Sequence, residues 1–144
     1  MQKDNQPENA ERLMVLIDQN TGALTKAREF KNNDRVTIKE VSKAATIADI
    51  LRIHDYRYIK RVIHKCEQLF KRIATENDDT ASRYDNDSHI SANTWNAALQ
   101  ACGAVIEACD QVMTPQYRNA FCAIRPPGHH AGVFGKTFKN NVCD

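Results

Sequence analysis

The sequence predicts an α/β domain that is mostly helical over the length of this chain. Two long segments, 57–75 and 92–113, carry apolar residues at intervals of three and four, as amphipathic helices do. Residues 119–124 form a short apolar run without charge, which is typical of a fully buried strand. Two prolines and two histidines follow that run closely, and α/β sheets often place functional groups at such strand ends. We therefore expect helices packed on a sheet, with a site at the end of one strand.

Length and composition limit the class of protein. A chain of 144 residues suffices for one ordinary domain, and 42% hydrophobic with 26% charged residues is typical of a soluble globular protein. The net charge of +2 is too small to argue for direct nucleic-acid or membrane binding. No apolar run approaches the roughly 20 residues of a spanning helix, and the polar residues 1–5 do not resemble a signal peptide. Five cysteines lack paired metal-ligand spacing, so reduced thiols of an intracellular protein are expected: Cys66, Cys102, Cys109, Cys122 and Cys143.

The chain is expected to open with a helix. Asn5 is the expected N-cap, Pro7 falls in the first turn, and Glu8 stands three residues after the cap. Gly22 is a natural stop for this helix. Arg12 lies beside the apolar stripe and, taken alone, is most simply a solvated arginine. The stripe consists of Ala10, Leu13, Met14 and Ile17.

Three more elements are expected before the middle of the chain. Segment 35–41 has β-branched residues in partial alternation and should be extended. Thr46 should cap a short helix that contains Ile47, Ile50, Leu51 and Ile53. The helix over 57–75 has a basic face. Such a face can bind a membrane surface or calmodulin, but more commonly it is only solvated, and we favour the solvated face. The polar loop 76–80 could attract a cationic peptide with its acidic residues, but a solvated loop is the simpler interpretation.

Asp87 and His89 are separated by one residue, a spacing that can supply two metal ligands. Two ligands do not make a site, and no third acidic or histidine partner stands at motif spacing. We therefore expect a loop at 87–89, followed by a helix with Ser91 as its N-cap. Alanines in that helix should allow close packing against a sheet. The large residues expected in its buried face are Trp95, Leu99, Cys102, Ile106, Cys109 and Met113.

The octet 125–132 is the candidate active-site loop. Its proline pair ends strand pairing, because proline has no N–H to donate, and Gly128 lets the backbone turn or approach a ligand closely. His129 and His130 follow at once. Imidazole changes charge near neutral pH, so an adjacent pair suits general acid–base chemistry on a polarised water. A bare histidine pair is more often a solvated turn, but the whole octet favours an active site.

The octet and the strand before it resemble the signature of the histone deacetylase family, which consists of zinc-dependent amidohydrolases that remove acetyl groups from lysine. Segments 7–13, 43–59 and 85–91 resemble the opening helix and the next two landmarks of that family, in the family's order. The resemblance implies that residues 1–144 are the N-terminal part of an arginase/deacetylase-like parallel-sheet domain. The strand that normally precedes the opening helix is expected to be missing, and a family histidine is replaced by Gln6.

The same resemblance implies roles for four residues. His130 would be the main general base and then the acid, and His129 would be its electrostatic and orienting partner. Arg12 matches an arginine at the floor of the family's substrate tunnel, and Gly128 would belong to the substrate and product channel. None of these four residues is expected to bind metal.

The last residues echo the family pattern only partly. Phe138 and 140–142 resemble a segment that lines the substrate tunnel, in a shortened and altered form. The family's zinc ligands and transition-state tyrosine are then expected beyond Asp144, so the chain alone is expected to be inactive.

Two hypotheses follow. The first is a truncated deacetylase whose complete, zinc-containing form hydrolyses acetyl-lysine in histones or other proteins. Co-repressor proteins are its expected partners, and the nucleus and/or cytoplasm its expected location. The second is a catalytically inactive deacetylase fragment that acts as a protein-interaction module.

Overall fold

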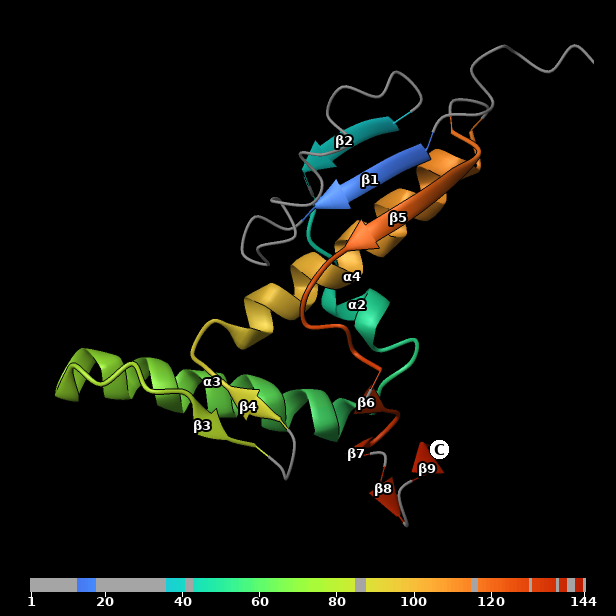
Figure 1. Cartoon of the computed structure of the whole chain (residues 1–144). Coiled ribbons are helices and arrows are strands. Elements are labelled where there is room, and N and C mark those ends of the chain that lie inside the picture. The colour runs from blue at the N-terminus through green and yellow to red at the C-terminus, as the bar shows by residue number, and fades with distance from the viewer. Residues whose placement is uncertain are drawn as a thin grey trace, which may run out of the picture. The chain divides into compact units, whose positions relative to one another are not determined.

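The computed structural model divides the chain into two compact units, residues 1–45 with 100–125 and residues 46–99 with 126–144 (Figure 1). The division passes through a single helix, α4 (Thr94–Val112). The structure describes residues 13–17, 36–40, 43–84, 88–114, 117–129, 131–136, 138–139 and 142–143.

The first unit contains a three-stranded parallel sheet. Its strands are β2 (Val36–Glu40), β1 (Leu13–Ile17) and β5 (Asn119–Ala123), in that spatial order. Val15 of the central strand stands opposite Ile38 on one side and Phe121 on the other. Figure 1 shows the three arrows side by side and pointing the same way. The parallel sheet confirms the predicted α/β class, and β2 confirms the extended segment predicted over 35–41.

The helix predicted at the start of the chain is wrong over Leu13–Ile17, which forms the central strand β1. Five consecutive apolar residues are compatible with a buried helix and with a strand covered on both faces, and periodicity cannot separate the two. In the structure this segment is a strand, because it pairs in parallel with a strand on each side. The predicted cap, first turn and stop of that helix lie outside the described residues, and so does Arg12.

Small residues of α4 pack the helix against the sheet. Ala108 and Tyr117 form a buried cluster with Ala120 and Cys122 beside them. The Cys122 Sγ lies 3.8 Å from the backbone oxygen of Ala104. The predicted close packing of alanines on a sheet is therefore confirmed, since Ala101, Gly103, Ala104 and Ala108 are the buried residues of this helix.

The large residues predicted for the buried face of α4 are mostly on its exposed side. Ile106 is 38% exposed and Met113 is 85% exposed. Cys102 and Cys109 are also exposed, whereas Trp95 is partly buried. The spacing of large side chains pointed to the wrong face, because the face of small residues lets the helix backbone come closer to the sheet.

Full burial of the strand over 119–124 was also predicted and is wrong. Ala120 and Cys122 pack on the helix side, but Phe121 points the other way and is 61% exposed. The strand therefore buries one face against the described residues of its unit.

The second unit begins with two capped helices, α2 (Ile47–Ile50) and α3 (Tyr56–Glu76). Thr46 confirms the predicted cap: the Asp49 N–H donates to its hydroxyl at 3.3 Å, and its own N–H donates to the Asp49 carboxylate at 2.9 Å. Asp55 caps α3, since its carboxylate accepts the Arg57 N–H at 2.8 Å. The helix ends at Asn77, which has the left-handed φ of 52°.

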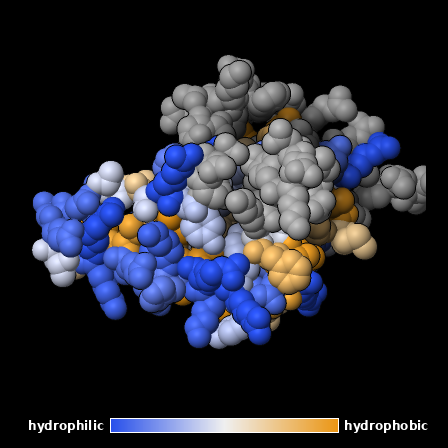
Figure 2. Space-filling view, turned by 90° about the horizontal axis from the view of Figure 1, so that it is seen from below, coloured by the Kyte–Doolittle hydropathy of each residue, from blue (hydrophilic) through white to orange (hydrophobic). Residues whose placement is uncertain are grey.

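Helix α3 buries one face and exposes a basic one. Cys66 and Leu69 form a buried cluster with Ile90, and Val62, Ala92 and Trp95 pack against it. Arg57, Lys60, Arg61 and Lys71 are exposed. Figure 2 shows hydrophilic side chains over much of this side of the molecule, with hydrophobic atoms exposed between them.

Short antiparallel pairs complete the second unit. β3 (Ser82–Arg83) pairs with β4 (His89–Ile90), so His89 lies in a strand and not in the predicted loop. The Ser91 N–H donates to the Thr94 hydroxyl at 2.8 Å just before α4, which begins at Thr94. The remaining pairs are β6 (Ala131–Gly132) with β7 (Gly135–Lys136) and β8 (Phe138–Lys139) with β9 (Val142–Cys143).

Candidate functional site

The candidate site is the turn that contains His129. Gly128 has a φ of +80°, and a Cβ built there would meet nothing within 4 Å. The glycine therefore serves the backbone conformation and not a close contact. The Ala131 N–H donates to the Gly128 oxygen at 2.9 Å and closes a four-residue turn. His129 is exposed in this turn, and His130 lies outside the described residues.

A hairpin follows the turn directly. Ala131 stands opposite Lys136 and Gly132 opposite Gly135. The two residues at the tip, Val133 and Phe134, are 50% and 71% exposed. The turn with His129 thus runs into a structural element that begins at Ala131.

The segment at the start of α3 binds this hairpin through three consecutive carbonyl groups. One ring nitrogen, one backbone N–H and one guanidinium each donate to a different carbonyl, so both the direction and the register of the hairpin are specified. The pairs are His54 Nδ1 with Gly132 O at 2.9 Å, Asp55 N with Val133 O at 2.8 Å, and Arg61 Nη2 with Phe134 O at 3.2 Å.

Aromatic packing reinforces these bonds. Gly135 has a φ of +97°, and a Cβ there would lie 2.5 Å from the Tyr58 ring, so only glycine fits. The Tyr58 ring meets the His54 ring edge-on, with 5.4 Å between ring centroids and 68° between ring planes. His54, Tyr58 and Gly135 therefore form one contact set behind the turn.

Only two of the four predicted site residues lie in the part of the chain that the structure describes. Gly128 and His129 lie in one turn, whereas no described geometry tests Arg12 or His130. The sequence analysis missed the roles of His54 and Tyr58, although both stand in the segment 43–59 that resembles a family landmark. The signal that was available is the glycine after the tip, since a glycine in a hairpin marks a close approach of another group.

Buried thiols do not add a reactive group. Burial raises the pKa of the Cys66 thiol, and a hydrogen bond with the Trp95 backbone opposes this only in part. Burial also raises the pKa of Cys122. Protonated thiols are poor nucleophiles and poor metal ligands at neutral pH. Both cysteines are free thiols in the structure, as are Cys102 and Cys109.

Within the described ranges, no three histidine, cysteine or carboxylate side chains come together in a way that could hold a metal ion. The zinc implied by the family resemblance therefore does not fit the side chains that are described. The Asp78 carboxylate is engaged within its own loop: it accepts hydrogen bonds from the Thr80 hydroxyl and N–H and pairs with Arg72. These contacts, led by the Thr80 hydroxyl, hold the pKa of Asp78 below its ordinary value.

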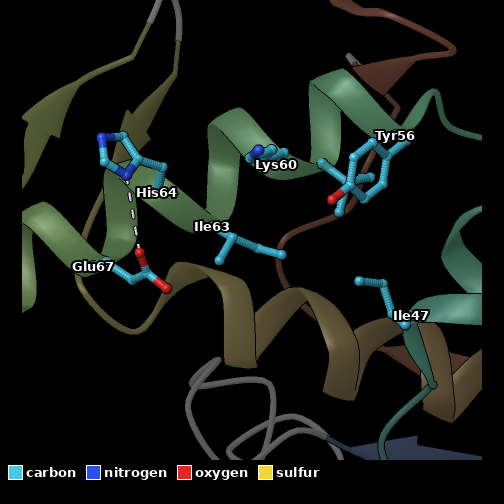
Figure 3. A pocket seen from close by; sticks show the side chains of 7 residues that line it. Ile47, Tyr56, Lys60, Ile63, His64 and Glu67 are labelled. Carbon is cyan, nitrogen blue, oxygen red and sulfur yellow. Dashed lines mark ion pairs between the residues drawn. The ribbon is translucent and has the colours of Figure 1, made fainter.

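A hollow of about 290 Å³ lies along α3 (Figure 3). His64 and Glu67 form an ion pair at its edge, with 3.9 Å between Nδ1 and the carboxylate, and both side chains are more than 60% exposed. An exposed pair of this kind contributes little stability. The residues that line the hollow include no convergent set of acid, base and nucleophile. These residues are Ile47, Tyr56, Ile59, Lys60, Ile63, His64 and Glu67.

None of the helices in the described part of the chain combines the length and apolar character needed to cross a membrane.

A three-stranded parallel sheet with helix α4 packed against it defines an α/β domain. The chain belongs to the histone deacetylase domain family, whose model matches residues 6–142. That family consists of hydrolases that are generally zinc-dependent.

Relatives support the assignment. Type-2 histone deacetylase 2 of Dictyostelium discoideum is 33% identical over 131 residues, which cover 80% of this chain and 8% of that protein. Histone deacetylase clr3 of Schizosaccharomyces pombe is 30% identical over 132 residues, 89% of this chain and 18% of that protein. A probable deacetylase of Archaeoglobus fulgidus is 28% identical over 145 residues, 99% of this chain and 35% of that protein. The chain thus spans 8% to 35% of the length of these relatives.

The fold has a solved counterpart. The crystal structure of the HDA15 HD domain matches with a TM-score of 0.68 and 18% identity, over 88% of this chain and 39% of that one. The mixed helices and partial parallel sheet are therefore those of a part of an arginase/deacetylase fold, as the sequence predicted.

Proposed function

We propose that this chain carries the proton-transfer histidines of a protein lysine deacetylase, a hydrolase that acts on the linear amide of acetyl-lysine. The observation that supports this most is the closed turn at Gly128 and His129, which is bound to the start of α3 through the hairpin that follows it. A solvated turn without function needs no such support.

In the proposed reaction, water adds to the acetyl carbonyl carbon and gives its proton to His130. The C–N bond then breaks, and His130 returns the proton to the lysine nitrogen, which leaves as the amine. The acetyl group is released as acetic acid, whose remaining proton passes to the amine to give acetate and the lysine ammonium. His129, beside the base, orients it and stabilises its charged form. Positioned acid–base groups contribute on the order of 100- to 10,000-fold to such steps.

Zinc supplies Lewis-acid chemistry in the family, but the described side chains offer no ligand set for it. The complete enzyme would need ligands from other residues, and we expect this chain alone to be inactive.

Further features of the proposed enzyme follow from family membership. Its substrate would be an acetylated histone or another acetyl-lysine protein, with Arg12 and Gly128 in the substrate and product channel. Co-repressor proteins are proposed partners, and the nucleus and/or cytoplasm is the proposed location. Direct binding to nucleic acid or to a membrane is not part of the proposal.

The test compares the 144-residue chain with an extended chain, in which the remaining deacetylase domain of the Archaeoglobus relative is joined to its C-terminus. We expect zinc-dependent hydrolysis of acetyl-lysine peptides by the extended chain only. His130→Ala should lower turnover by about 100-fold or more, and His129→Ala by less. His64→Ala, which changes an exposed histidine of α3, is the matched control and should leave turnover unchanged. Near-normal turnover of His130→Ala with zinc bound would contradict the mechanism.

A catalytically inactive fragment that acts as a protein-interaction module is the second candidate. Exposed apolar side chains favour it, since Phe70 is 65% and Phe134 is 71% exposed, and exposed apolar patches often bind partners. An extended chain without turnover, together with a stable 144-residue product in cells, would favour this candidate over the enzyme.

A further inference from the structure

The hairpin 131–136 is too small to hold its own orientation. It has two paired positions, Ala131 with Lys136 and Gly132 with Gly135. An isolated two-stranded hairpin is at best marginally stable in water. The position of the hairpin must therefore be fixed by contacts with another element. Within the second unit, segment 54–61 makes such contacts.

Of the three hydrogen bonds from segment 54–61 to the hairpin, the bond of His54 lies nearest in sequence to His129. Its Nδ1 lies 2.9 Å from the oxygen of Gly132, two residues after His130. A carbonyl oxygen only accepts, so Nδ1 must carry the proton in this bond. The ring is half-buried and meets the Tyr58 ring edge-on. The imidazole is thus fixed by an aromatic ring and by a hydrogen bond to the hairpin.

The backbone beneath this ring is also fixed. The His54 N–H donates to the Ile50 oxygen of α2 at 3.0 Å. The next residue, Asp55, caps α3 and donates its own N–H to Val133 at 2.8 Å. His54 therefore projects from the junction of two capped helices, which is a firm support for a short hairpin.

We propose that His54, supported by Tyr58, is a positioning residue for the turn that contains His129. It acts through the hairpin, whose first strand begins at Ala131, and so determines where the backbone of His129 stands. This role rests on the proposed function, because a displacement of about 1 Å in a reacting group can greatly reduce the rate.

Two amide substitutions separate a hydrogen bond at Nδ1 from a general need for a polar side chain. His54→Asn places an amide N–H near the position of Nδ1, and His54→Gln places it one bond farther out, near the position of Nε2. We expect the asparagine variant to keep the bond to Gly132 and the glutamine variant to lose it. His64→Gln makes the same change at an exposed histidine of α3 and is the matched control.

The first measurement is amide hydrogen exchange of Asp55 and Ala131 in the 144-residue chain, since these N–H groups report hairpin docking and turn closure. His54→Gln should accelerate both exchange rates about tenfold. The variant lacks the hydrogen bond to Gly132, so local opening of the hairpin costs about one hydrogen bond less. His54→Asn and His64→Gln should leave both rates unchanged. Equal rates in the asparagine and glutamine variants, or no acceleration by glutamine, would overturn the proposal.

The second measurement uses the extended chain. His54→Gln should lower kcat with little change in KM, and His54→Asn should restore it. If exchange responds but kcat does not, the positioning role is wrong while the deacetylase function stands. If the unsubstituted extended chain has no turnover, the proposed function fails, and a kcat role for His54 fails with it. The exchange rates then still decide whether His54 holds the hairpin.

Discussion

Cys66 of α3 is buried in the cluster that includes Ile90, against which Trp95 packs. Burial raises the pKa of this thiol in the folded chain. The folded thiol therefore stays protonated at a pH where the unfolded one has begun to ionise. Its contribution to stability is complete below the ordinary thiol pKa of roughly 8.5 and is lost as the pH rises through the higher folded value.

We therefore expect the free energy of unfolding to fall more steeply between pH 8 and pH 10 in the unsubstituted chain than in Cys66→Ala. Urea unfolding at several pH values measures this slope. Identical slopes for the unsubstituted chain and Cys66→Ala would refute the expectation.

Single residues of the site differ in how far the sequence predicted them. Gly128 follows a proline pair, a local pattern that already implies a turn, and its positive φ agrees with that. The role of His54 depends on a bond to Gly132, 78 residues away, and no local pattern contains that information. Gly135 could have been noticed, but its partner Tyr58 could not have been named from sequence alone.

Helix α4 shows what a single glycine does for the packing of an element. A Cβ on Gly103 would lie 1.9 Å from the Lys43 oxygen and 2.7 Å from the Ala45 nitrogen. Both atoms belong to the backbone, which cannot rotate away as a flexible side chain would. The helix and the segment before α2 therefore touch backbone to backbone.

Gly103→Ala should destabilise the chain by about 3 kcal/mol, because the added methyl must push the helix away from residues 43–45. Gly128→Ala is the comparison, since it has space for a methyl but a φ of +80°, and should cost about 1 kcal/mol. Midpoints of urea unfolding followed by circular dichroism measure both. Gly103→Ala with stability equal to that of Gly128→Ala would show that the contact is not tight.

Among whole elements, the long helices and β2 were predictable because their patterns are periodic or rich in β-branched residues. β1 was not, because five apolar residues carry no period and its pairing partners are distant. The buried face of α4 was misjudged for a related reason. The spacing of the large apolar side chains predicted that they form the buried face of α4. The buried residues are the small ones, because they allow the helix to pack closely on the sheet.

The molecule as a whole exposes large apolar side chains on both units. Met113 is 85% exposed, Phe70 is 65% exposed, and Phe121 of the edge strand β5 is 61% exposed. Exposed apolar groups favour association between chains, and so does the outer edge of β5, which pairs with no further strand among the described residues.

We expect the 144-residue chain to self-associate as its concentration rises, and sedimentation velocity measures this. Phe70→Glu and Met113→Glu should each reduce association, because they replace an exposed apolar group with a charge. Gln68→Glu adds the same charge to α3 without removing an apolar group and serves as the control. Association that is equal in all of these variants would exclude these side chains as its cause.

The strand order β2-β1-β5 has a consequence for how the chain is made. β1 pairs with a strand that lies about 100 residues later, so a ribosome synthesises that partner long after β1 has emerged. At roughly 5–20 residues per second, the wait is about 5–20 s. During that interval one edge of an apolar strand has no native neighbour. A nascent chain of this design should therefore depend on chaperones that bind extended apolar segments during translation.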